Sequence, residues 1–210
     1  MTVQLQPLPE KTFLGNGHNT QGVTVLLDAA LKAFRKIGYH GATIRNIAKE
    51  VGVTPATVYH HFESKQEILV RIMEKAMRDN ISAVVAAYEA APQGDHLAQL
   101  GAMIAAIVDY HAEYPEEAFV GNSELRSLEE EGFALIAALR NAEEDFFIQL
   151  IDSGVAAGVF TTANSKFAAR ALISLASSVG NWYRPDGPLS IDEIRNEYVE
   201  YATNMIRADR

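Results

Sequence analysis

One short segment, residues 43–65, gathers side chains that can donate hydrogen bonds to a partner rich in oxygen atoms. It reads TIRNIAKEVGVTPATVYHHFESK and carries hydroxyls, a phenol, two imidazoles and ammonium groups. From Val51 to Phe62 it contains no acidic residue. Such groups suit phosphates and base edges, and a Thr or Ala methyl can contact a thymine methyl. The segment therefore has the chemistry of a nucleic-acid contact surface.

The chain's other reactive side chains do not favour metal binding or catalysis. His60 and His61 are adjacent, so on a helix they point about 100° apart and cannot hold one metal ion together. Among Asp109, His111 and Glu113, only the two acids share a helical face. The sequence contains no Gly-rich phosphate loop, no GxSxG and no HExxH. We therefore expect no catalytic residue, no metal ligand, no cofactor and no enzyme activity.

The capping residues and the glycine in this segment predict two short helices joined by a tight turn. Thr43 caps the first helix, and Gly52 ends it because only glycine takes a left-handed backbone at little cost. Thr54 caps the second helix, and Pro55 occupies its first position. This arrangement is typical of a helix-turn-helix, whose second helix enters the DNA major groove. On spacing alone, an ordinary helical hairpin with a solvated outer face remains the alternative.

Residues 25–74 resemble the N-terminal domain of the tetracycline-repressor (TetR) family of transcriptional regulators. The resemblance is carried in order by AALKAFRKIGYHGATI, IAKEVGV and VYHHFESKQEIL. The last run is similar to the family's tyrosine–aromatic–His–Phe–x–x–Lys–x–x–Leu pattern. The resemblance implies double-stranded operator DNA as a partner. The DNA-contacting residues predicted on this basis are Thr43, Thr54, Pro55, Ala56, Thr57, Tyr59, His60, His61 and Lys65.

Two of these positions depart from the family pattern. Pro55 stands where many members carry a basic or small residue, and His60 stands where an aromatic residue is common. Both departures leave open which base sequence the protein reads. They do not change the expected mode of docking on DNA.

The composition is that of a globular protein. The chain has 210 residues, of which 48% are hydrophobic, and no cysteine. This length suffices for one long or two small domains. The absence of cysteine excludes disulfides and thiolate metal sites. With no membrane-length apolar run and no secretion signal, we expect no membrane partner and a cytoplasmic location.

Charge is spread unevenly along the chain, whose formal net charge is −9. Residues 19–81 hold nine Lys/Arg and six Asp/Glu, a net charge of +3. Residues 82–210 hold eight Lys/Arg and twenty Asp/Glu, a net charge of −12. Screening confines each patch to about 10 Å at 0.1 M salt, so an acidic protein can still bind DNA through a segregated basic face.

Helical periodicity without a strand signal predicts an all-α fold of about nine helices. A flexible N-terminal arm is expected over residues 1–18, and a three-helix helix-turn-helix domain over residues 19–63. Its first helix runs from about Gly22 to Ile37 and stops at Gly38. Residues 64–210 are expected to form a helical ligand-binding and dimerisation domain.

A long helix over residues 64–91 is the expected mechanical link between these two domains. Ser64 and Glu67 predict a capping box at its start, and Pro92 follows its end. No loop separates it from the DNA-binding part, so a displacement of this helix would reach the recognition helix.

In the second half, Asp95 is expected to cap a helix that ends near Tyr114, and Pro115 to start another. A long helix follows from about Glu130 to Ala157. The last helix begins at a second capping box, which Ser190 and Glu193 form. The helix expected before it, around residues 168–180, is rich in Ala and Ser.

The last two helices are the predicted dimer interface. Small residues permit close packing, and a 3–4 apolar stripe suits a partner helix. The fold also resembles one whose last two helices form a four-helix bundle across a two-fold axis. The alternative is that they only close the protomer's own core. The predicted interface residues are Ala171, Leu175, Val179, Ile191, Ile194, Tyr198, Tyr201 and Met205.

A set of aromatic, aliphatic and arginine side chains is the candidate lining of an effector pocket. Aromatic residues at helical spacing are more often core, but together they can line an apolar cavity, and an arginine can hold a carboxylate or phosphate. The candidate lining residues are Met103, Ile107, Phe119, Arg126, Phe133, Arg140, Phe146, Phe147, Leu150, Trp182 and Tyr183.

The segments NSELRSL and NWYRPDGPLS resemble those of family members that respond to acyl-CoA thioesters or related lipid-derived ligands. The alternatives left open are another hydrophobic effector and no small ligand. We therefore expect a homodimeric, ligand-responsive regulator, most simply a repressor released from a palindromic operator by its effector. The rival from another class is a helical dimer that acts through protein partners without a small-molecule effector.

Overall fold

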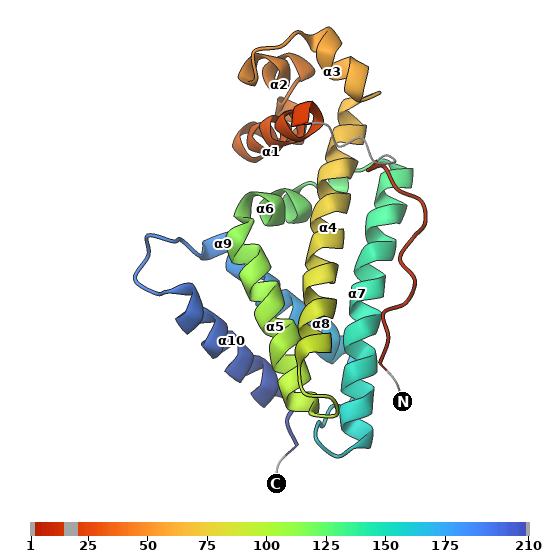
Figure 1. The fold of residues 1–210 in the computed structure, drawn as a ribbon, viewed down its shortest axis with the longest axis vertical. Coiled ribbons are helices and arrows are strands. Elements are labelled where there is room, and N and C mark those ends of the chain that lie inside the picture. Colours follow the sequence, from red (N-terminus) through yellow and green to blue (C-terminus); the bar gives the residue numbers. More distant parts are fainter. Residues whose placement is uncertain (1–2, 15–20, 209–210) are drawn as a thin grey trace. The chain divides into compact units, whose positions relative to one another are not determined.

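The computed structural model describes residues 3–14 and 21–208. Within these ranges it contains ten α helices and one short 3₁₀ helix, so the predicted all-α class is confirmed (Figure 1). The helices are α1 (Gln21–Gly41), α2 (Ile44–Glu50), α3 (Pro55–His61), α4 (Lys65–Ala90), α5 (His96–Glu113), α6 (Pro115–Ser123), η1 (Leu125–Ser127), α7 (Glu130–Ala156), α8 (Ser165–Ser177), α9 (Val179–Trp182) and α10 (Ile191–Ile206). The helix beyond the expected nine is α9, a single turn after α8. None of the helices described has the length and apolar character needed to cross a lipid bilayer.

The predicted capping residues start both helices of the helix-turn-helix. Thr43 and Asn46 form a capping box, in which the Thr43 Oγ1 accepts from the Asn46 N–H at 3.1 Å. Gly52 has φ +72°, the left-handed backbone that its turn requires. Thr54 Oγ1 accepts from the Thr57 N–H at 3.2 Å, and Pro55 follows at the first helical position. These helix boundaries are therefore set by local sequence.

The predicted stop of the first helix is a kink. Gly38 has φ 73° and ψ 161°, which breaks the helical path, and one further turn follows it within α1. The regular part of α1 buries Leu26, Ala30 and Phe34. The extra turn buries Tyr39 and places its backbone beside the start of α4.

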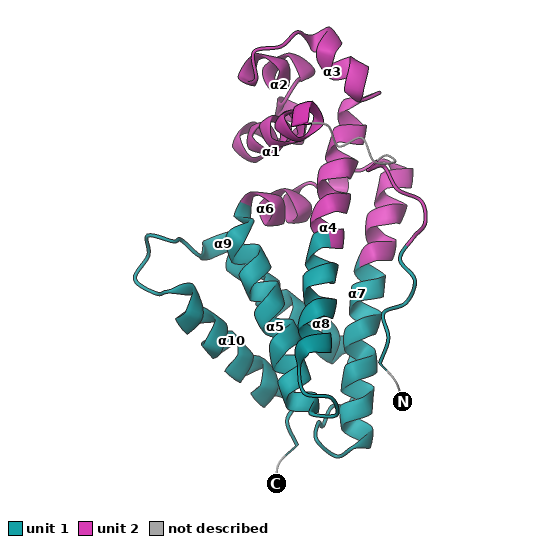
Figure 2. Ribbon diagram, in the orientation of Figure 1, with its two compact units in different colours: residues 1–8, 79–115, 140–210 teal, residues 9–78, 116–139 magenta. Residues whose placement is uncertain are grey.

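The chain forms two compact units, drawn in different colours in Figure 2. Unit 2 comprises residues 9–78 and 116–139, and unit 1 comprises residues 3–8, 79–115 and 140–208 of the described chain. Helices α4 and α7 each contribute to both units. In this division α6, η1 and the start of α7 are grouped with the helix-turn-helix. The domain boundary between residues 63 and 64, which the sequence suggested, stays a prediction.

Unit 1 has a hydrophobic core around α5, which packs against α8, α9 and α10. Met103, Ile104 and Ile107 of α5 are fully buried there, together with Phe147 of α7 and Leu172 of α8. The strong burial of α5 makes it the central helix of this unit.

The part of the expected N-terminal arm that the structure describes, residues 3–14, is held by contacts. In unit 1, the Gln4 N–H donates to Gln149 Oε1 at 3.0 Å, and Val3 and Leu5 pack against the core. In unit 2, the Phe13 N–H donates to Glu74 Oε2 at 2.7 Å. These residues therefore differ from the free arm that the sequence suggested, and the arm's other residues lie outside those described. Composition alone cannot show such contacts.

Candidate DNA-binding surface and effector region

Helix α3 presents the predicted contact residues outward and anchors itself through two others. Val58 and Phe62 are buried, at 0% and 2% exposure. On the opposite side Tyr59 is 56% exposed and His60 is also exposed. Thr54, Pro55 and Ala56 are exposed at its start, while Thr57 and His61 are half-buried. The helix thus offers a continuous outer face of small, hydroxyl, phenol and imidazole groups.

The threonine hydroxyls of this surface are already oriented by the helix caps. Thr43 Oγ1 donates to Asn46 Oδ1 at 2.6 Å. The hydroxyls of Thr54 and Thr57 lie 3.0 Å apart, within hydrogen-bond distance of one another. Their positions are therefore fixed before any ligand arrives, and a hydroxyl oxygen has a second lone pair to offer.

The imidazoles of His60 and His61 lie edge to face, with ring centroids 5.2 Å apart. Over the described ranges, no group of three or more His, Cys, Asp or Glu side chains is arranged to hold a metal ion. Two rings that both reach the outer surface of α3 are suited to donating hydrogen bonds to phosphates or base edges.

Lys65 has a structural role that the sequence did not reveal. Its Nζ donates to the backbone carbonyls of Tyr39 at 2.7 Å and Ala42 at 2.8 Å, and it lies 4.2 Å from the centroid of the Tyr39 ring. Partial burial lowers the pKa of the Lys65 ammonium, and the carboxylate of Glu124 partly offsets this. An ammonium has three donors, so one remains for a phosphate.

Two cationic residues on α2 were not among the predicted DNA-contacting residues. Arg45 and Lys49 are exposed, and neither forms an ion pair with a residue that the structure describes. Arg45 lies near the start and Lys49 near the end of α2, the first helix of the helix-turn-helix, which in such motifs crosses the DNA backbone. Their charge and their outward positions on the predicted first helix were the available signals.

Two polar residues that contact Tyr39 were also missed by the prediction. They are Glu124, which follows α6, and Gln66 on α4. Glu124 Oε1 accepts from the Tyr39 N–H at 3.2 Å, and its Oε2 accepts from the Ser127 hydroxyl at 2.8 Å. The Tyr39 hydroxyl lies 2.9 Å from the side-chain amide of Gln66. Within unit 2, the loop after α6 is therefore hydrogen-bonded to the end of α1. Nothing in the local sequence pattern predicts this pairing.

The predicted pocket residues belong to both units. Met103, Ile107, Phe146, Phe147 and Leu150 are buried in the core of unit 1. Three others, Phe119, Arg126 and Phe133, belong to unit 2.

Within unit 2, Phe133 is 48% exposed, and Phe119 lies 4.8 Å from the guanidinium of Arg35. Phe119 lines a hollow of about 510 Å³ with Lys32, Arg35, Lys36 and Glu116, so its place in an effector pocket stays a prediction, as does that of Phe133. Helical spacing shows that a side chain is apolar and periodic, but not which helix faces which.

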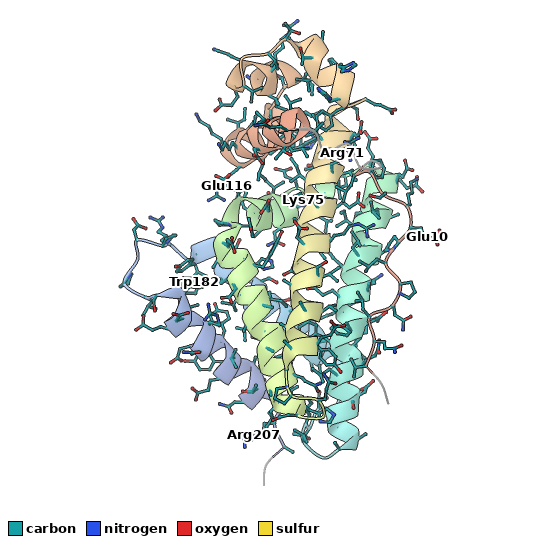
Figure 3. All side chains as sticks on the ribbon, in the orientation of Figure 1. Glu10, Arg71, Lys75, Glu116, Trp182 and Arg207 are labelled. Atoms are coloured by element: carbon teal, nitrogen blue, oxygen red, sulfur yellow. The ribbon has the colours of Figure 1, made fainter. Side chains whose placement is uncertain are left out.

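The remaining predicted pocket residues lie at edges of unit 1. Trp182 of α9 is 47% exposed and donates from Nε1 to the Tyr198 hydroxyl at 3.1 Å (Figure 3). Tyr183 lines a hollow of about 400 Å³ with residues of α5 and α10. One of these, Asp109, forms an ion pair with Arg195 at 2.7 Å. Asp109 thus joins α5 to α10.

Arg140 lies close to a buried polar pair that the sequence did not reveal. Burial lowers the pKa of Arg140, while the charge of Glu143 raises it. Glu143 Oε1 accepts from Asn80 Nδ2 at 2.7 Å, and both residues are buried. Burial raises the pKa of Glu143 to about 7, although Asn80 and Arg140 oppose the rise. Asn80 Oδ1 is buried without a hydrogen-bond partner.

The predicted dimer residues divide by burial. Val179 and Ile194 are buried in the core of their own unit, so they are corrected from interface to core positions. Tyr201 and Met205 are 58% and 51% exposed. Leu175, Ile191 and Tyr198 are half-buried, and Ala171 is exposed. The available apolar face therefore lies on the C-terminal half of α10 and beside α8.

Comparisons with known proteins agree with this architecture. Residues 26–72 match the family model described as bacterial regulatory proteins, tetR family. Residues 93–206 match the model of the tetracyclin repressor-like C-terminal domain. The chain therefore belongs to the TetR family, whose members are DNA-binding transcription regulators and not enzymes.

Individual relatives cover most of the chain. It is 26% identical over 179 residues to the HTH-type transcriptional repressor KstR2 of Rhodococcus jostii (strain RHA1), which covers 84% of this chain and 86% of that protein. A crystal structure of a tetR-family regulatory protein from Rhodococcus RHA1 is 30% identical with a TM-score of 0.85, covering 91% of this chain and all of that one. The TetR-family regulator PfmR of Thermus thermophilus is 29% identical with a TM-score of 0.78, covering 88% of this chain and 99% of that one.

Proposed function

We propose that this regulator is a homodimeric repressor that binds an approximately palindromic operator and is released by a small hydrophobic effector. In this proposal each α3 enters one of two successive major grooves and reads base edges through Tyr59, His60 and the exposed residues before them. Lys65 contacts a phosphate with its remaining donor. As a partner of chromosomal DNA, the protein acts in the cytoplasm.

The observation that carries the proposal is the exposed, acid-free outer face of α3 on a rigid support. Val58 and Phe62 fix the helix from below, and the caps at Thr54 and Thr57 fix its start. A helix-turn-helix reads DNA as a dimer when two half-sites lie one helical turn apart. The exposed Tyr201 and Met205 on α10 supply an apolar surface for that dimer.

Repression and an acyl-CoA-like effector are supported by relatives. The KstR2 proteins that match this chain are transcriptional repressors. AibR, which has the same fold at 21% identity, has been solved with isovaleryl coenzyme A and operator DNA. An acyl-CoA thioester is therefore the first effector to test, followed by other apolar molecules.

The effector has to discriminate strongly between two conformations. Shifting operator occupancy from 1:99 to 99:1 requires a preference of about 5.5 kcal/mol for the released form. Two sites in a dimer would share this amount. In the proposed mechanism the effector displaces α4 and so changes the separation of the two recognition helices.

Fluorescence anisotropy tests the proposal directly. The purified protein is titrated onto labelled DNA from upstream of its own gene, at several salt concentrations and against excess random DNA. Tight binding that resists the competitor, with two protomers per site, is expected. Binding equal to that of random DNA would contradict operator recognition there. Acyl-CoAs are then added to the bound complex, and loss of anisotropy identifies an effector.

A further inference from the structure

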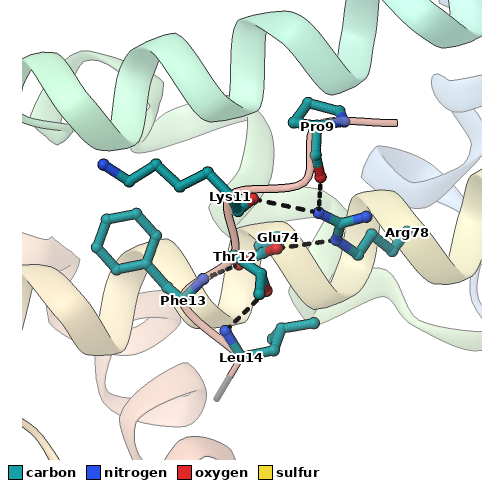
Figure 4. A network of polar contacts seen from close by, with 7 residues as sticks. All are labelled: Pro9, Lys11, Thr12, Phe13, Leu14, Glu74 and Arg78. Atoms are coloured by element: carbon teal, nitrogen blue, oxygen red, sulfur yellow. Dashed lines mark hydrogen bonds and ion pairs between the residues drawn. The ribbon is translucent and has the colours of Figure 1, made fainter. Parts of the chain in front are cut away.

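Residues 9–14, called the strap below, are tied to α4 by a directional polar network (Figure 4). The Phe13 N–H donates to Glu74 Oε2 at 2.7 Å. The other oxygen of this carboxylate, Oε1, accepts from Arg78 Nε at 2.8 Å. Arg78 in turn donates from Nη2 to the Pro9 carbonyl at 3.0 Å. The guanidinium and the carboxylate together hold both ends of the strap.

The strap donates a hydrogen bond to the buried carboxylate of Glu74. Glu74 has 0% exposure, so water does not reach its carboxylate. A buried carboxylate has to be paired and hydrogen-bonded to be tolerated. Arg78 satisfies one oxygen and the strap's Phe13 satisfies the other. Undocking the strap would leave one oxygen without this donor, which favours the docked state.

The strap lines one hollow together with the turn that joins the recognition helix to α4. Thr12 and Phe13 line a hollow of about 490 Å³ with residues of that turn and of α4, and with the start of α7. Lys11 forms an ion pair with Glu131 at the start of α7. The strap therefore bridges α4 and α7 within unit 2.

Side chains that line this hollow also contact residues at the end of α3. Arg71 on α4 is labelled in Figure 3. Its guanidinium lies 5.1 Å from the ring centroid of Phe62, the C-cap residue of α3. Arg71 also pairs with Glu67, whose Oε2 accepts from the Glu63 N–H at 2.6 Å. Contacts thus run without a break from the strap's pocket to the recognition helix.

The residues that precede the strap are anchored in the other unit. Gln4 is hydrogen-bonded to Gln149, and Val3 and Leu5 pack on the core of unit 1.

We propose that the strap is a positioning element for DNA binding, held by Glu74 and Arg78. Docked, it fixes the start of α4, and with it α3, in the conformation that binds the operator. Released, it lets α3 sample other positions, and the apparent affinity falls by the fraction of molecules that remain competent. This inference rests on the proposed operator binding. The strap does not itself contact DNA in this mechanism.

Arg78→Ala is the primary test, measured by operator anisotropy and by hydrogen exchange of the Phe13 amide. We expect affinity to fall about tenfold, as when one molecule in ten stays competent. The dependence of log affinity on log salt should keep its slope, because no phosphate contact is lost. The Phe13 amide should be protected in the wild type and lose protection in the variant. Lys36→Ala removes the same charge from an exposed position of unit 2 and should leave Phe13 protection unchanged.

A second pair of variants separates positioning from misfolding. Arg78→Lys keeps the charge but loses the planar guanidinium whose Nε and Nη2 reach Glu74 and Pro9 in fixed directions, so it should also weaken binding. Replacement of residues 9–14 by Gly and Ser changes none of the described helices and keeps residues 3–5, and it should weaken binding as much as Arg78→Ala, with the helical circular dichroism retained.

Several results would overturn the inference. These are unchanged or tighter operator binding by folded Arg78→Ala, a salt slope reduced by about one unit, or rapid Phe13 exchange in the wild type. If the wild type showed no preference for operator DNA over random DNA, the proposed function would be refuted. The predicted effect of Arg78→Ala on operator affinity would then fail as well. The Phe13 measurement would still decide whether the strap is docked, so the two failures are distinguishable.

Discussion

The ammonium of Lys65 and the carbonyl oxygen of Tyr39 are joined by a hydrogen bond of 2.7 Å, which links the first residue of α4 to the last turn of α1. A second bond reaches Ala42 at 2.8 Å. Carbonyls at a helix end lack helical partners, and a cation there is favourable. Lys65 thus holds the helix-turn-helix against α4, in addition to the phosphate contact proposed for it.

Lys65→Ala should therefore act on both stability and DNA binding. Loss of two charge-assisted bonds at a half-buried site should lower the free energy of unfolding by about 1–2 kcal/mol. Loss of a phosphate contact should weaken operator and random DNA alike and reduce the salt slope by about 0.9. Urea unfolding and salt-dependent anisotropy measure the two effects. Exposed Lys36→Ala is the stability control, and an unchanged salt slope in Lys65→Ala would exclude the phosphate contact.

Tyr59→Ala should change which sequences are bound and leave the fold intact. Its side chain is 56% exposed, so stability should change by less than about 0.5 kcal/mol. A lost base contact should cost about 1–3 kcal/mol on operators that carry the preferred base at one position. Anisotropy on a set of single-base operator variants tests this, and Tyr59→Phe isolates the hydroxyl. Equal losses on random DNA would instead indicate a backbone contact.

Local signals in the sequence were sufficient for the helix boundaries. Thr43, Gly52 and Thr54 act through groups within a few residues of themselves, so their roles can be read without a partner element. The same holds for Ser190, whose capping box with Glu193 is observed. The outer face of α3 was also predictable, because Val58 and Phe62 mark the buried side by spacing.

Contacts between distant segments could not be predicted in the same way. Lys65 was predicted to contact a phosphate from the family pattern and from its place at the start of a helix, but the carbonyls of Tyr39 in α1 and of Ala42 just after α1 also accept hydrogen bonds from it. Phe133 is as apolar as Phe147, yet one is 48% exposed and the other 0%. The difference depends on which helices pack together. A single sequence does not contain that information in its periodicity.

The buried acid Glu143 predicts a pH-dependent stability. Its pKa is raised by burial from 4.5 to about 7. The folded state therefore binds more protons than the unfolded state between these values, so the free energy of unfolding falls as pH rises through this window. Each pKa unit corresponds to about 1.4 kcal/mol, which sets an upper limit of about 3 kcal/mol.

Glu143→Gln should remove this dependence, because an amide does not ionise and can still accept from Asn80. The variant should be more stable than the wild type at pH 8, by about 1–3 kcal/mol, and close to it at pH 5. Urea unfolding from pH 5 to 8 measures the difference. Asp145→Asn, an acid-to-amide change at an exposed position of α7, is the control and should keep the wild-type slope. Parallel pH curves for wild type and Glu143→Gln would contradict the shift.

Burial decides which residue best tests the dimer. Tyr198 is half-buried, its hydroxyl lies 3.1 Å from both Trp182 Nε1 and Ser178 Oγ, and its ring stacks on Trp182 at 6.3 Å. A charge at Tyr198 would damage the protomer as well as an interface. Met205 is 51% exposed and lies on the same helix.

Met205→Asp should therefore dissociate the dimer without unfolding the protomer. An aspartate buried in an apolar interface costs several kcal/mol in each copy of a two-fold contact, which exceeds what a modest interface can offset. Light scattering coupled to size exclusion should show a mass near 23.0 kDa, the mass of one chain, whereas twice that value is expected for the wild type. Leu189→Asp places the same charge at an exposed residue of the loop before α10 and should leave the dimer intact. If Met205→Asp stays dimeric, the C-terminal half of α10 is not the interface. If it becomes monomeric and also loses operator preference, dimerisation through α10 is what brings the two recognition helices together.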